Sequence, residues 1–282
     1  MPRGRKPTHA YSRTLGGEKL RALRQRAKLT LLDLEAATDF QIGTAHIHKI
    51  EVGMIKRPDP ETLNIMLIAL DASFIDRRDV LEAFGYTTPV YLPTEEEIDE
   101  ARILCTHELH DATYPIYLID IGQRLLAWNR YVPRLIGMHP DDPSLVQFVG
   151  VTVFDLAFNP TYPVKHLIDN PDEYLPAMLK FIKTGLEPFR EESWYATLLA
   201  QARELPGFSE IWDSLDADAY ERYTNWSIIP VRIKLQHAGV IQFRVSSSDL
   251  LIDPRFRIVH FTPFGATALR QCAIWAEEEG IL

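Results

Sequence analysis

The chain has 282 residues, of which 46% are hydrophobic and 24% charged. This composition is typical of soluble globular proteins, and the length suits one large or two ordinary domains. The net charge of −9 argues against nucleic-acid binding by the chain as a whole. The charge is unevenly divided, however: residues 1–60 carry 12 Lys and Arg against 6 Asp and Glu, whereas residues 61–282 carry 18 against 33. This division predicts a basic head that attracts phosphate and an acidic body with a different task.

The sequence lacks the motifs of common catalytic sites. It contains no Gly-rich phosphate loop, no H-E-x-x-H and no G-x-S-x-G. A self-cleaving repressor would need a Lys beside a nucleophilic Ser, and no Lys is suitably placed for the run Ser246–Ser248. We therefore predict a protein that is not an enzyme and has no catalytic cofactor.

Two features bear on the cellular compartment. Cys105 and Cys272 stand at neither metal-ligand nor C-x-x-C spacing, so we expect two reduced, buried thiols. The sequence shows no secretory signal pattern and no apolar run of about 18 residues. These features predict a cytoplasmic protein with no membrane partner.

A basic arm is predicted over residues 1–17, which open as MPRGRKP. Its Arg-Gly-Arg segment could lie in the narrow minor groove of A·T-rich DNA. The alternative is a basic tail that only adds sequence-independent affinity.

A two-helix pattern follows the arm. Thr30 and Asp33 fit a T-x-x-D capping box, which predicts a helix start. The apolar periodicity then breaks, and a second short helix is predicted over residues 44–51, with Ile47 and Ile50 facing inward. Two such helices indicate a helix-turn-helix, whose second helix enters the major groove of DNA.

The outward side of this second helix supplies the candidate DNA contacts. Four of its residues are expected to reach bases: Thr44, Ala45, His46 and Lys49. Three residues are expected to contact phosphate: His48, Lys56 and Arg57. The two histidines are equally well explained as exposed side chains without a role. No metal is expected, because no carboxylate or Cys joins them at ligand spacing.

Three strings of the head carry a family resemblance: LRALRQRAKLT, IHKIEVGMIKRPDPETL and IALDAS. Within the second string, Ile47, Ile50, Glu51 and Gly53 fit the pattern I-x-x-[IL]-E-x-G. Residues from about 15 to 72 thus resemble the XRE family of helix-turn-helix domains, which includes lambdoid phage repressors.

The XRE resemblance implies an all-α DNA-binding domain of about five helices, assigned to residues 18–88. It also implies an ion pair between Arg24 and Glu51 that holds the recognition helix in place. The turn between the second and third helices is about two residues longer than is usual in the family.

A linker is predicted over residues 89–94, and the body over residues 95–282. Proline is expected to interrupt the middle of the body at Pro160, Pro163, Pro171 and Pro176. Helices are expected over residues 95–110, 129–137, 173–185, 191–205 and 266–279. Strands are expected over residues 114–121, 124–128, 223–235, 240–246 and 256–262. This order predicts an α+β, PAS-like body: a five-stranded antiparallel sheet wrapped by helices.

Three segments of the body carry a second resemblance: Ala127–Arg130, LPGFSEIW at residues 205–212, and IVHFTP at residues 258–263. They resemble the ligand-binding domain of MmyB-like transcription regulators. The two resemblances together cover nearly the whole chain and imply a bacterial transcription regulator with an XRE head and a PAS-like body. They also imply a ligand of the fatty-acid type.

A fatty-acid site needs an apolar tunnel with a polar or cationic group for the carboxylate. The candidate lining residues are Tyr117, Ile119, Trp128, Phe154, Phe158, Trp194, Trp226, Ile228, Phe243 and Phe261. The candidate carboxylate partners are Arg130, Arg190, Arg244 and His260. Each also has an ordinary explanation, as a core aromatic residue or as a cation directed to water.

We therefore expect a homodimer that binds an inverted-repeat operator in double-stranded DNA. A small apolar ligand, a long-chain fatty acid, would bias the dimer between geometries for which its affinity differs. The alternative is a ligand-free dimeric repressor whose body serves only dimerisation or partner binding.

Overall fold

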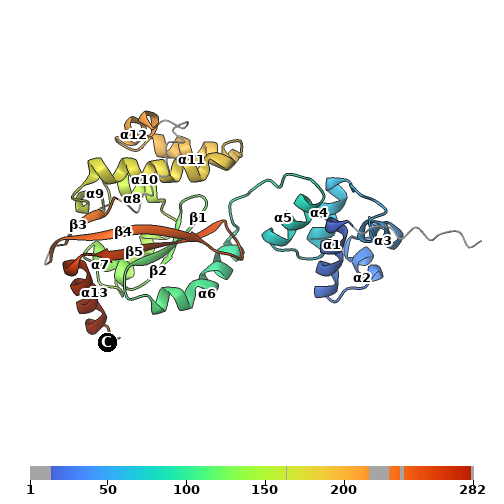
Figure 1. Cartoon of the computed structure of the whole chain (residues 1–282), viewed down its shortest axis with the longest axis horizontal. Coiled ribbons are helices and arrows are strands. Elements are labelled where there is room, and N and C mark those ends of the chain that lie inside the picture. The colour runs from blue at the N-terminus through green and yellow to red at the C-terminus, as the bar shows by residue number, and fades with distance from the viewer. Residues whose placement is uncertain (1–13, 163, 216–228, 236–237, 281–282) are drawn as a thin grey trace, which may run out of the picture. The chain divides into compact units, whose positions relative to one another are not determined.

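The computed structural model describes residues 14–162, 164–215, 229–235 and 238–280. The chain divides between Pro89 and Val90 into two compact units, a helical head and an α+β body (Figure 1). The predicted arm up to residue 13, and Trp226 and Ile228 among the predicted lining residues, lie outside the described residues.

The described part of the head consists of helices: α1 (Leu15–Arg26), α2 (Leu31–Ala37), α3 (Thr44–Glu51), α4 (Pro60–Ala69) and α5 (Phe74–Ala83). The Thr30–Asp33 capping box is present at the start of α2. At α4, Asp59 accepts hydrogen bonds from the first-turn amides, and Pro60 occupies a position where its missing N–H is not needed. The core consists of one face of each helix, with fully buried Leu20, Leu34, Ile47, Ile50, Leu63, Met66 and Leu67.

Helix α1 begins at Leu15, three residues before the predicted start at Glu18. Glycine is unfavourable in a helix interior, so the presence of Gly16 and Gly17 within α1 needs a reason. Tertiary packing requires the pair. A Cβ atom on Gly17 would lie 2.5 Å from the carbonyl oxygen of Ile50, so only glycine lets α1 approach the end of α3 this closely.

Within the described part of the body, five strands form one antiparallel sheet of order β2-β1-β5-β4-β3. The strands are β1 (Ile116–Asp120), β2 (Leu125–Trp128), β3 (Val231–Leu235), β4 (Gly239–Asp249) and β5 (Phe256–Phe264). The predicted fold class is confirmed: an all-α head, and a body with a five-stranded antiparallel sheet and surrounding helices.

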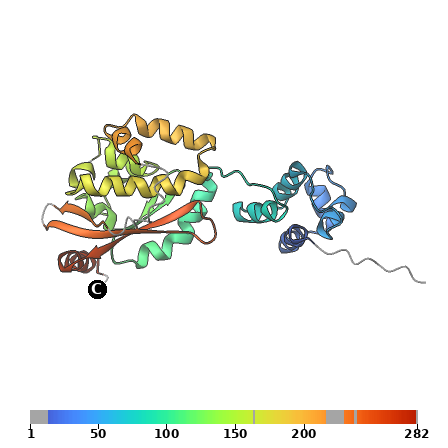
Figure 2. The ribbon, with the colours of Figure 1, turned by 45° about the horizontal axis from the view of Figure 1, so that its top comes forward.

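Helices cover the sheet from more than one side, as the turned view also shows (Figure 2). The α-helices are α6 (Glu95–Asp111), α7 (Tyr131–Leu135), α8 (Val153–Phe158), α9 (Val164–Leu167), α10 (Pro171–Leu186), α11 (Ser193–Arg203), α12 (Phe208–Ser214) and α13 (Ala266–Glu278). Two 3-10 helices are η1 (Pro143–Phe148) and η2 (Glu187–Phe189).

The two faces of the sheet carry different cores, because successive residues of a strand point to opposite faces. Leu118 and Ile258 pack with the buried side of α6. Tyr117, Phe243 and Val259 face the other way, into the larger core that includes α10 and α12. The larger core is therefore the place to look for an apolar ligand.

Pro176, one of the prolines expected to interrupt the middle of the body, lies inside α10, where the helix predicted over residues 173–185 also placed it. A proline here removes the hydrogen bond that its N–H would donate to the carbonyl of Asp172. The helix persists because one of its faces is buried over its whole length, at Tyr174, Leu175, Met178, Leu179, Ile182 and Leu186.

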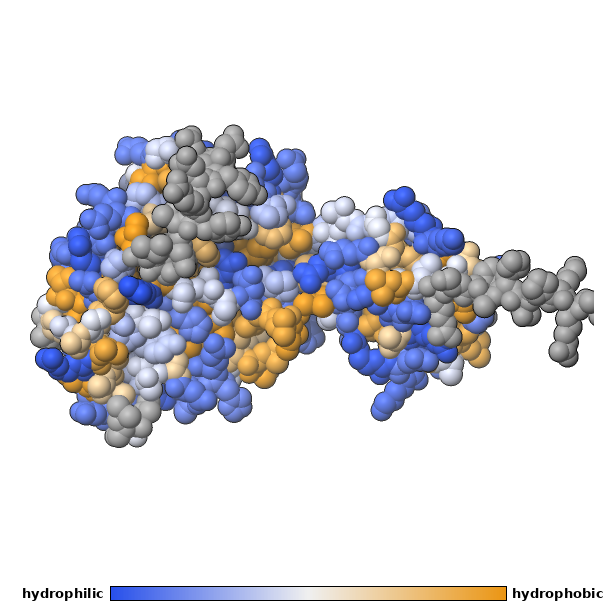
Figure 3. Space-filling view, in the orientation of Figure 1, coloured by the Kyte–Doolittle hydropathy of each residue, from blue (hydrophilic) through white to orange (hydrophobic). Residues whose placement is uncertain are grey.

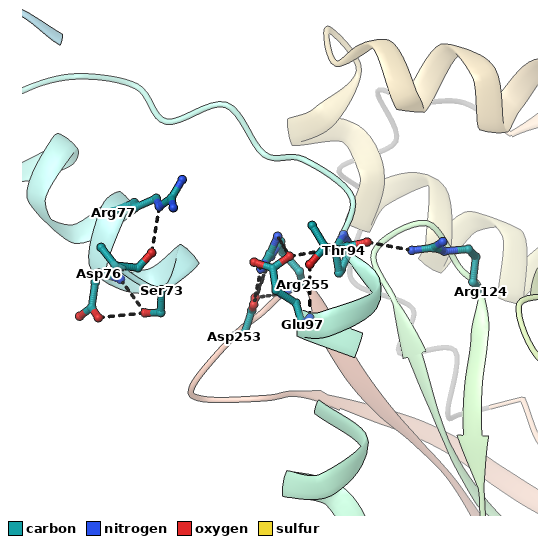
Figure 4. Close-up of polar contacts among 10 residues, drawn as sticks. Ser73, Asp76, Arg77, Thr94, Glu97, Arg124, Asp253 and Arg255 are labelled. Atoms are coloured by element: carbon teal, nitrogen blue, oxygen red, sulfur yellow. Dashed lines mark hydrogen bonds and ion pairs between the residues drawn. The ribbon is translucent and has the colours of Figure 1, made fainter. Parts of the chain in front are cut away.

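The start of α6 is fixed by a capping box joined to a buried ion pair (Figure 4). The Thr94 N–H donates to Glu97 Oε2 at 2.9 Å, and the Glu97 N–H donates to the Thr94 hydroxyl at 3.3 Å. Arg255 Nη2 donates to Glu97 Oε1 at 2.6 Å and to Asp253 Oδ2 at 2.7 Å, and its side chain is only 4% exposed. Burial alone would raise the pKa of Glu97, but the hydrogen bonds from Arg255 and Thr94 hold that pKa below its ordinary value.

We expect Glu97→Gln to lower the free energy of unfolding of the body at neutral pH. The variant's free energy of unfolding should also fall less steeply as the pH is lowered. A carboxyl whose pKa is lowered by folding contributes stability that is present above its unfolded pKa, near pH 4.5, and is lost as pH falls through the folded pKa. Urea unfolding followed by tryptophan fluorescence should show a loss of about 1–2 kcal/mol at pH 7. Glu96→Gln, an exposed neighbour, is the control; equal pH profiles for the two variants would contradict the role of Glu97.

Candidate functional site

Helix α3 has a buried inner side and an exposed outer side. Ile47 and Ile50 are fully buried in the core of the head. The outer side carries five of the predicted DNA contacts: half-buried Thr44 and exposed Ala45, His46, His48 and Lys49. The structure thus brings these side chains together on one accessible surface of a single helix.

The two remaining phosphate candidates follow α3. Lys56 and Arg57 are exposed, and the Arg57 guanidinium lies 5.1 Å from the centre of the Tyr86 ring. The Tyr86 hydroxyl donates to the carbonyl oxygen of Pro58 at 2.6 Å, which fixes the ring beneath Arg57. Sequence reasoning missed Tyr86; its only signal was an aromatic residue directly after the predicted helix-ending Gly85.

A buried ion pair holds the end of α3. Arg24 Nε and Nη2 donate to the two carboxylate oxygens of Glu51 at 2.7 and 2.8 Å, and Nη1 donates to the carbonyl of Leu29 at 2.8 Å. The Arg24 and Glu51 side chains are 11% and 3% exposed. The hydrogen bond with Glu51 raises the pKa of Arg24. Both charges are thus satisfied inside the head, where either alone would be costly.

The start of α3 is capped from outside the helix. Its N-cap residue, Gly43, has no side chain to accept a hydrogen bond. Glu35 of α2 does so instead, since the Thr44 N–H donates to Glu35 Oε2 at 3.1 Å. Sequence reasoning missed this contact because Glu35 and Thr44 are nine positions apart. Glu35 and Glu51 thus hold the two ends of the helix that carries the exposed side chains.

In the body, several predicted lining residues meet on the α10 side of the sheet. The rings of Tyr117 and Phe261 have centres 5.8 Å apart, and those of Phe261 and Phe243 are 6.1 Å apart. Trp128 is the register partner of Tyr117 on the neighbouring strand. Ile119 lies two residues along the same strand and is 4% exposed. These five side chains form a continuous apolar surface, which we call the aromatic face.

Phe154 and Phe158 belong to a second cluster, with two rings from the LPGFSEIW segment that were not predicted to line the site. Phe208 lies 5.2 Å from Phe154 and 5.5 Å from Phe158, measured between ring centres, and it stacks on Trp212 at 5.2 Å. Phe154, Phe158 and Phe208 are at most 2% exposed, which suits core packing.

Trp194 lies apart from both clusters and contacts Val90, the first residue of the body. Its indole N–H donates to the carbonyl oxygen of Val90 at 2.7 Å, and its ring lies 5.8 Å from Phe189. The Val90 N–H donates to Glu192 Oε1 at 3.0 Å. Both backbone groups of Val90 are therefore held by residues at the beginning of α11.

Two of the candidate carboxylate partners point away from the aromatic face. Arg244 follows Phe243, and His260 precedes Phe261, so strand alternation directs each cation to the opposite side of the sheet. Arg244 is exposed and lies 4.3 Å from the centre of the Phe264 ring. His260 Nε2 lies 3.7 Å from a carboxylate oxygen of Glu108, on α6.

The other two cations are paired at the surface. Arg130 Nη1 lies 3.3 Å from a carboxylate oxygen of Glu279, and Arg190, which is 63% exposed, donates to Glu187 at 3.0 Å. Among the described residues, none of the four predicted cations lies on the aromatic face.

Near the aromatic face, Tyr174 and Arg257 add polar groups that the prediction omitted, beside the hydroxyl of the predicted Tyr117. Tyr174 on α10 is 4% exposed, and burial raises the pKa of both Tyr174 and Tyr117, with the neighbouring Tyr117 adding to the shift of Tyr174. Both hydroxyls are therefore protonated donors at neutral pH. Arg257, the register partner of Ile119, shares this side of the sheet; its guanidinium lies 5.6 Å from the Phe181 ring centre and its Nε donates to Asp249 at 2.7 Å. The alternation Arg257, Val259, Phe261 was the signal for it.

The described residues include both cysteines of the chain. Cys105 and Cys272 are buried and unbridged, and burial raises the pKa of their thiols to about 11 and about 12. Among the described residues, no group of three or more His, Cys, Asp or Glu could hold a metal ion. No helix in the described ranges is both long and apolar enough to cross a membrane.

The structure thus shows two parts: a helical head, and a sheet domain whose aromatic face belongs to a core that helices help to form. Residues 106–272, more than half of the chain, match the family model of the MmyB-like transcription regulator ligand binding domain. The chain therefore belongs to this family, whose members are ligand-regulated transcription regulators and not enzymes. No curated protein matches the chain.

We expect Glu51→Ala to unfold the head while the body stays folded. Removing one partner of a buried ion pair leaves the other charge uncompensated, at a cost of about 3–5 kcal/mol. Hydrogen exchange of the full chain should show loss of amide protection in α1 to α3.

The control is Lys19→Ala, which breaks the partly exposed pair of Lys19 with Asp79. That change should cost less than about 1 kcal/mol. Unchanged protection of α3 in Glu51→Ala would show that the Arg24–Glu51 pair does not hold the head together.

Proposed function

We propose that this chain is a sequence-specific DNA-binding regulator whose body binds a small apolar ligand that modulates operator binding. The observation that carries the proposal is α3: a helix with a buried inner side and an exposed outer side that bears Lys49, in the same chain as a regulator's ligand-binding domain. The head acts as an XRE-type helix-turn-helix, with α3 in the major groove.

In this proposal, seven residues contact the operator. Thr44, Ala45, His46 and Lys49 reach base edges, while His48, Lys56 and Arg57 contact phosphates. The contact between Arg57 and the Tyr86 ring supports the phosphate role, because a guanidinium that is already positioned loses less side-chain freedom on binding.

The chain acts as a homodimer on an inverted repeat, with recognition helices about 34 Å apart. An exposed apolar patch on the body supports dimer formation; it is visible as orange surface over α6 (Figure 3). Ile103 and Leu104 of α6 are 72% and 55% exposed, and Leu251 and Ile252 of the β4–β5 turn are 96% and 63% exposed. Contiguous apolar surface of this kind marks association sites.

The ligand lies between the aromatic face and α10, and it is of the long-chain fatty-acid type. Phe261 and Trp128, which are only partly buried, offer apolar surface to an acyl chain. The protonated hydroxyl of Tyr117, on the aromatic face, is the donor for its carboxylate, in place of the four cations expected from the sequence.

DNA binding is tested on duplexes selected from a random pool by the full chain. We expect Lys49→Ala to bind the selected site about 10- to 100-fold more weakly and to relax selection at one position. Lys56→Ala should weaken binding to all sequences by a similar factor. It should also reduce the slope of log K against log salt concentration by about one. Arg203→Ala, an exposed cation of the body paired with Asp213, is the charge-matched control. Failure of the wild type to select any sequence would overturn the proposal.

Ligand binding is tested by native mass spectrometry of the purified chain, followed by organic extraction. A fatty acid at about one per chain is the expected result, and its titration should change operator affinity. Tyr117→Phe should weaken fatty-acid binding about 10- to 100-fold through loss of one hydrogen bond to a carboxylate, whereas Tyr162→Phe should not. An empty protein that binds no fatty acid by calorimetry would favour the ligand-free dimeric repressor instead.

A further inference from the structure

The turn that joins α2 to α3 has an unusual backbone. Asp39 and Phe40 have φ angles of 52° and 59°, so two consecutive residues other than glycine adopt the left-handed conformation. Aspartate tolerates this region comparatively well, whereas a bulky aromatic residue does not. Such strain persists only where the surrounding structure enforces it, and it concentrates at functional positions.

Hydrogen bonds of the head enforce this turn. The Phe40 N–H donates to the carbonyl oxygen of Glu35 at 3.0 Å, and the Gln41 N–H donates to that of Thr38 at 3.1 Å. The Thr38 side chain, 3% exposed, donates to the same Glu35 carbonyl at 2.8 Å. Glu35 also caps α3 through its contact with the Thr44 N–H. One residue therefore fixes Phe40 and the first residue of the proposed recognition helix together.

The Phe40 ring does not offset the strain by packing, because it is 71% exposed. The apolar contact of this turn with the core comes from Ile42, which is 6% exposed. An exposed aromatic side chain on a strained but well-anchored backbone is costly for folding alone, which points to a role outside the core of the head.

We propose that Phe40 reads DNA: its ring contacts the C5-methyl group of a thymine in the major groove, beside the bases read from α3. The inference rests on the proposed DNA-binding function. The exposed neighbours of Phe40 in sequence are Asp39 and Gln41. Glu35 ties this turn to the start of α3, whose exposed outer side carries His46 and Lys49 and is the side proposed to face DNA. The thymine methyl is the apolar group that the major groove presents, and phenylalanine is among the side chains that contact it.

This role gives a reason for the length of the turn. Residues 38–43 lie between α2 and α3, and the segment around Asp39 and Phe40 carries the ring outward while Ile42 returns to the core. A turn shortened at this point would lose the exposed aromatic ring ahead of Thr44. Phe40 thus extends the reading surface by one side chain beyond the helix itself.

The experiment uses the full chain and the duplex that it selects, with each thymine replaced in turn by uracil, which lacks only the methyl group. In wild type, replacement at one position of each half-site should weaken binding about fourfold, the value expected for one buried methyl group. Phe40→Ala should bind the thymine duplex about fourfold more weakly and should no longer distinguish thymine from uracil there, so that the two changes are not additive.

Two further variants separate this role from folding. Phe40→Gly suits the left-handed backbone, so the head should unfold at a temperature no lower than that of Phe40→Ala, while the discrimination is lost in both. Leu32→Ala, which removes an apolar side chain 64% exposed on α2, should keep the discrimination. If both Phe40 variants still discriminate like wild type, the role of Phe40 is overturned and DNA binding stands. If wild type selects no duplex, both proposals fall.

Discussion

The body depends on one geometric constraint: neighbouring side chains of a strand cannot face the same side of the sheet. In β5 this constraint places Phe261 on the aromatic face and His260 toward α6. In β4 it does the same to Phe243 and Arg244. Once the aromatic residues are buried, each adjacent cation is excluded from the same core. The described polar groups on the aromatic side of the sheet include the Tyr117 hydroxyl and Arg257.

The elements that the sequence predicts best are those encoded over a few residues. Thr30 with Asp33, and Thr94 with Glu97, each satisfy a helix start within one turn, so the α2 and α6 boundaries follow from local chemistry. The I-x-x-[IL]-E-x-G pattern likewise places the inner side of α3. The order of strands and helices sufficed for the fold class because the change from a period of 3.6 to a period of 2 is visible without any contact.

The sequence predicts poorly where distant residues decide. Gly17 belongs to a helix because the carbonyl of Ile50 leaves no room for a Cβ atom, and Glu35 caps a helix other than its own. Arg244 and His260 lie on the side of the sheet opposite the aromatic face because each adjoins an aromatic residue of that face on its strand. No local signal marks Tyr174 as the partner of Tyr117, since helix α10 and strand β1 supply them separately.

The grip on Val90 has a mechanical consequence. Trp194 and Glu192 hold the carbonyl and the amide of this residue, at the point where the chain enters the body. A displacement of the first turn of α11 therefore pulls directly on the peptide that leads back to the head. Through Val90, a rearrangement around α11 can act directly on the backbone that leads to the head. This route needs no contact surface between the two units.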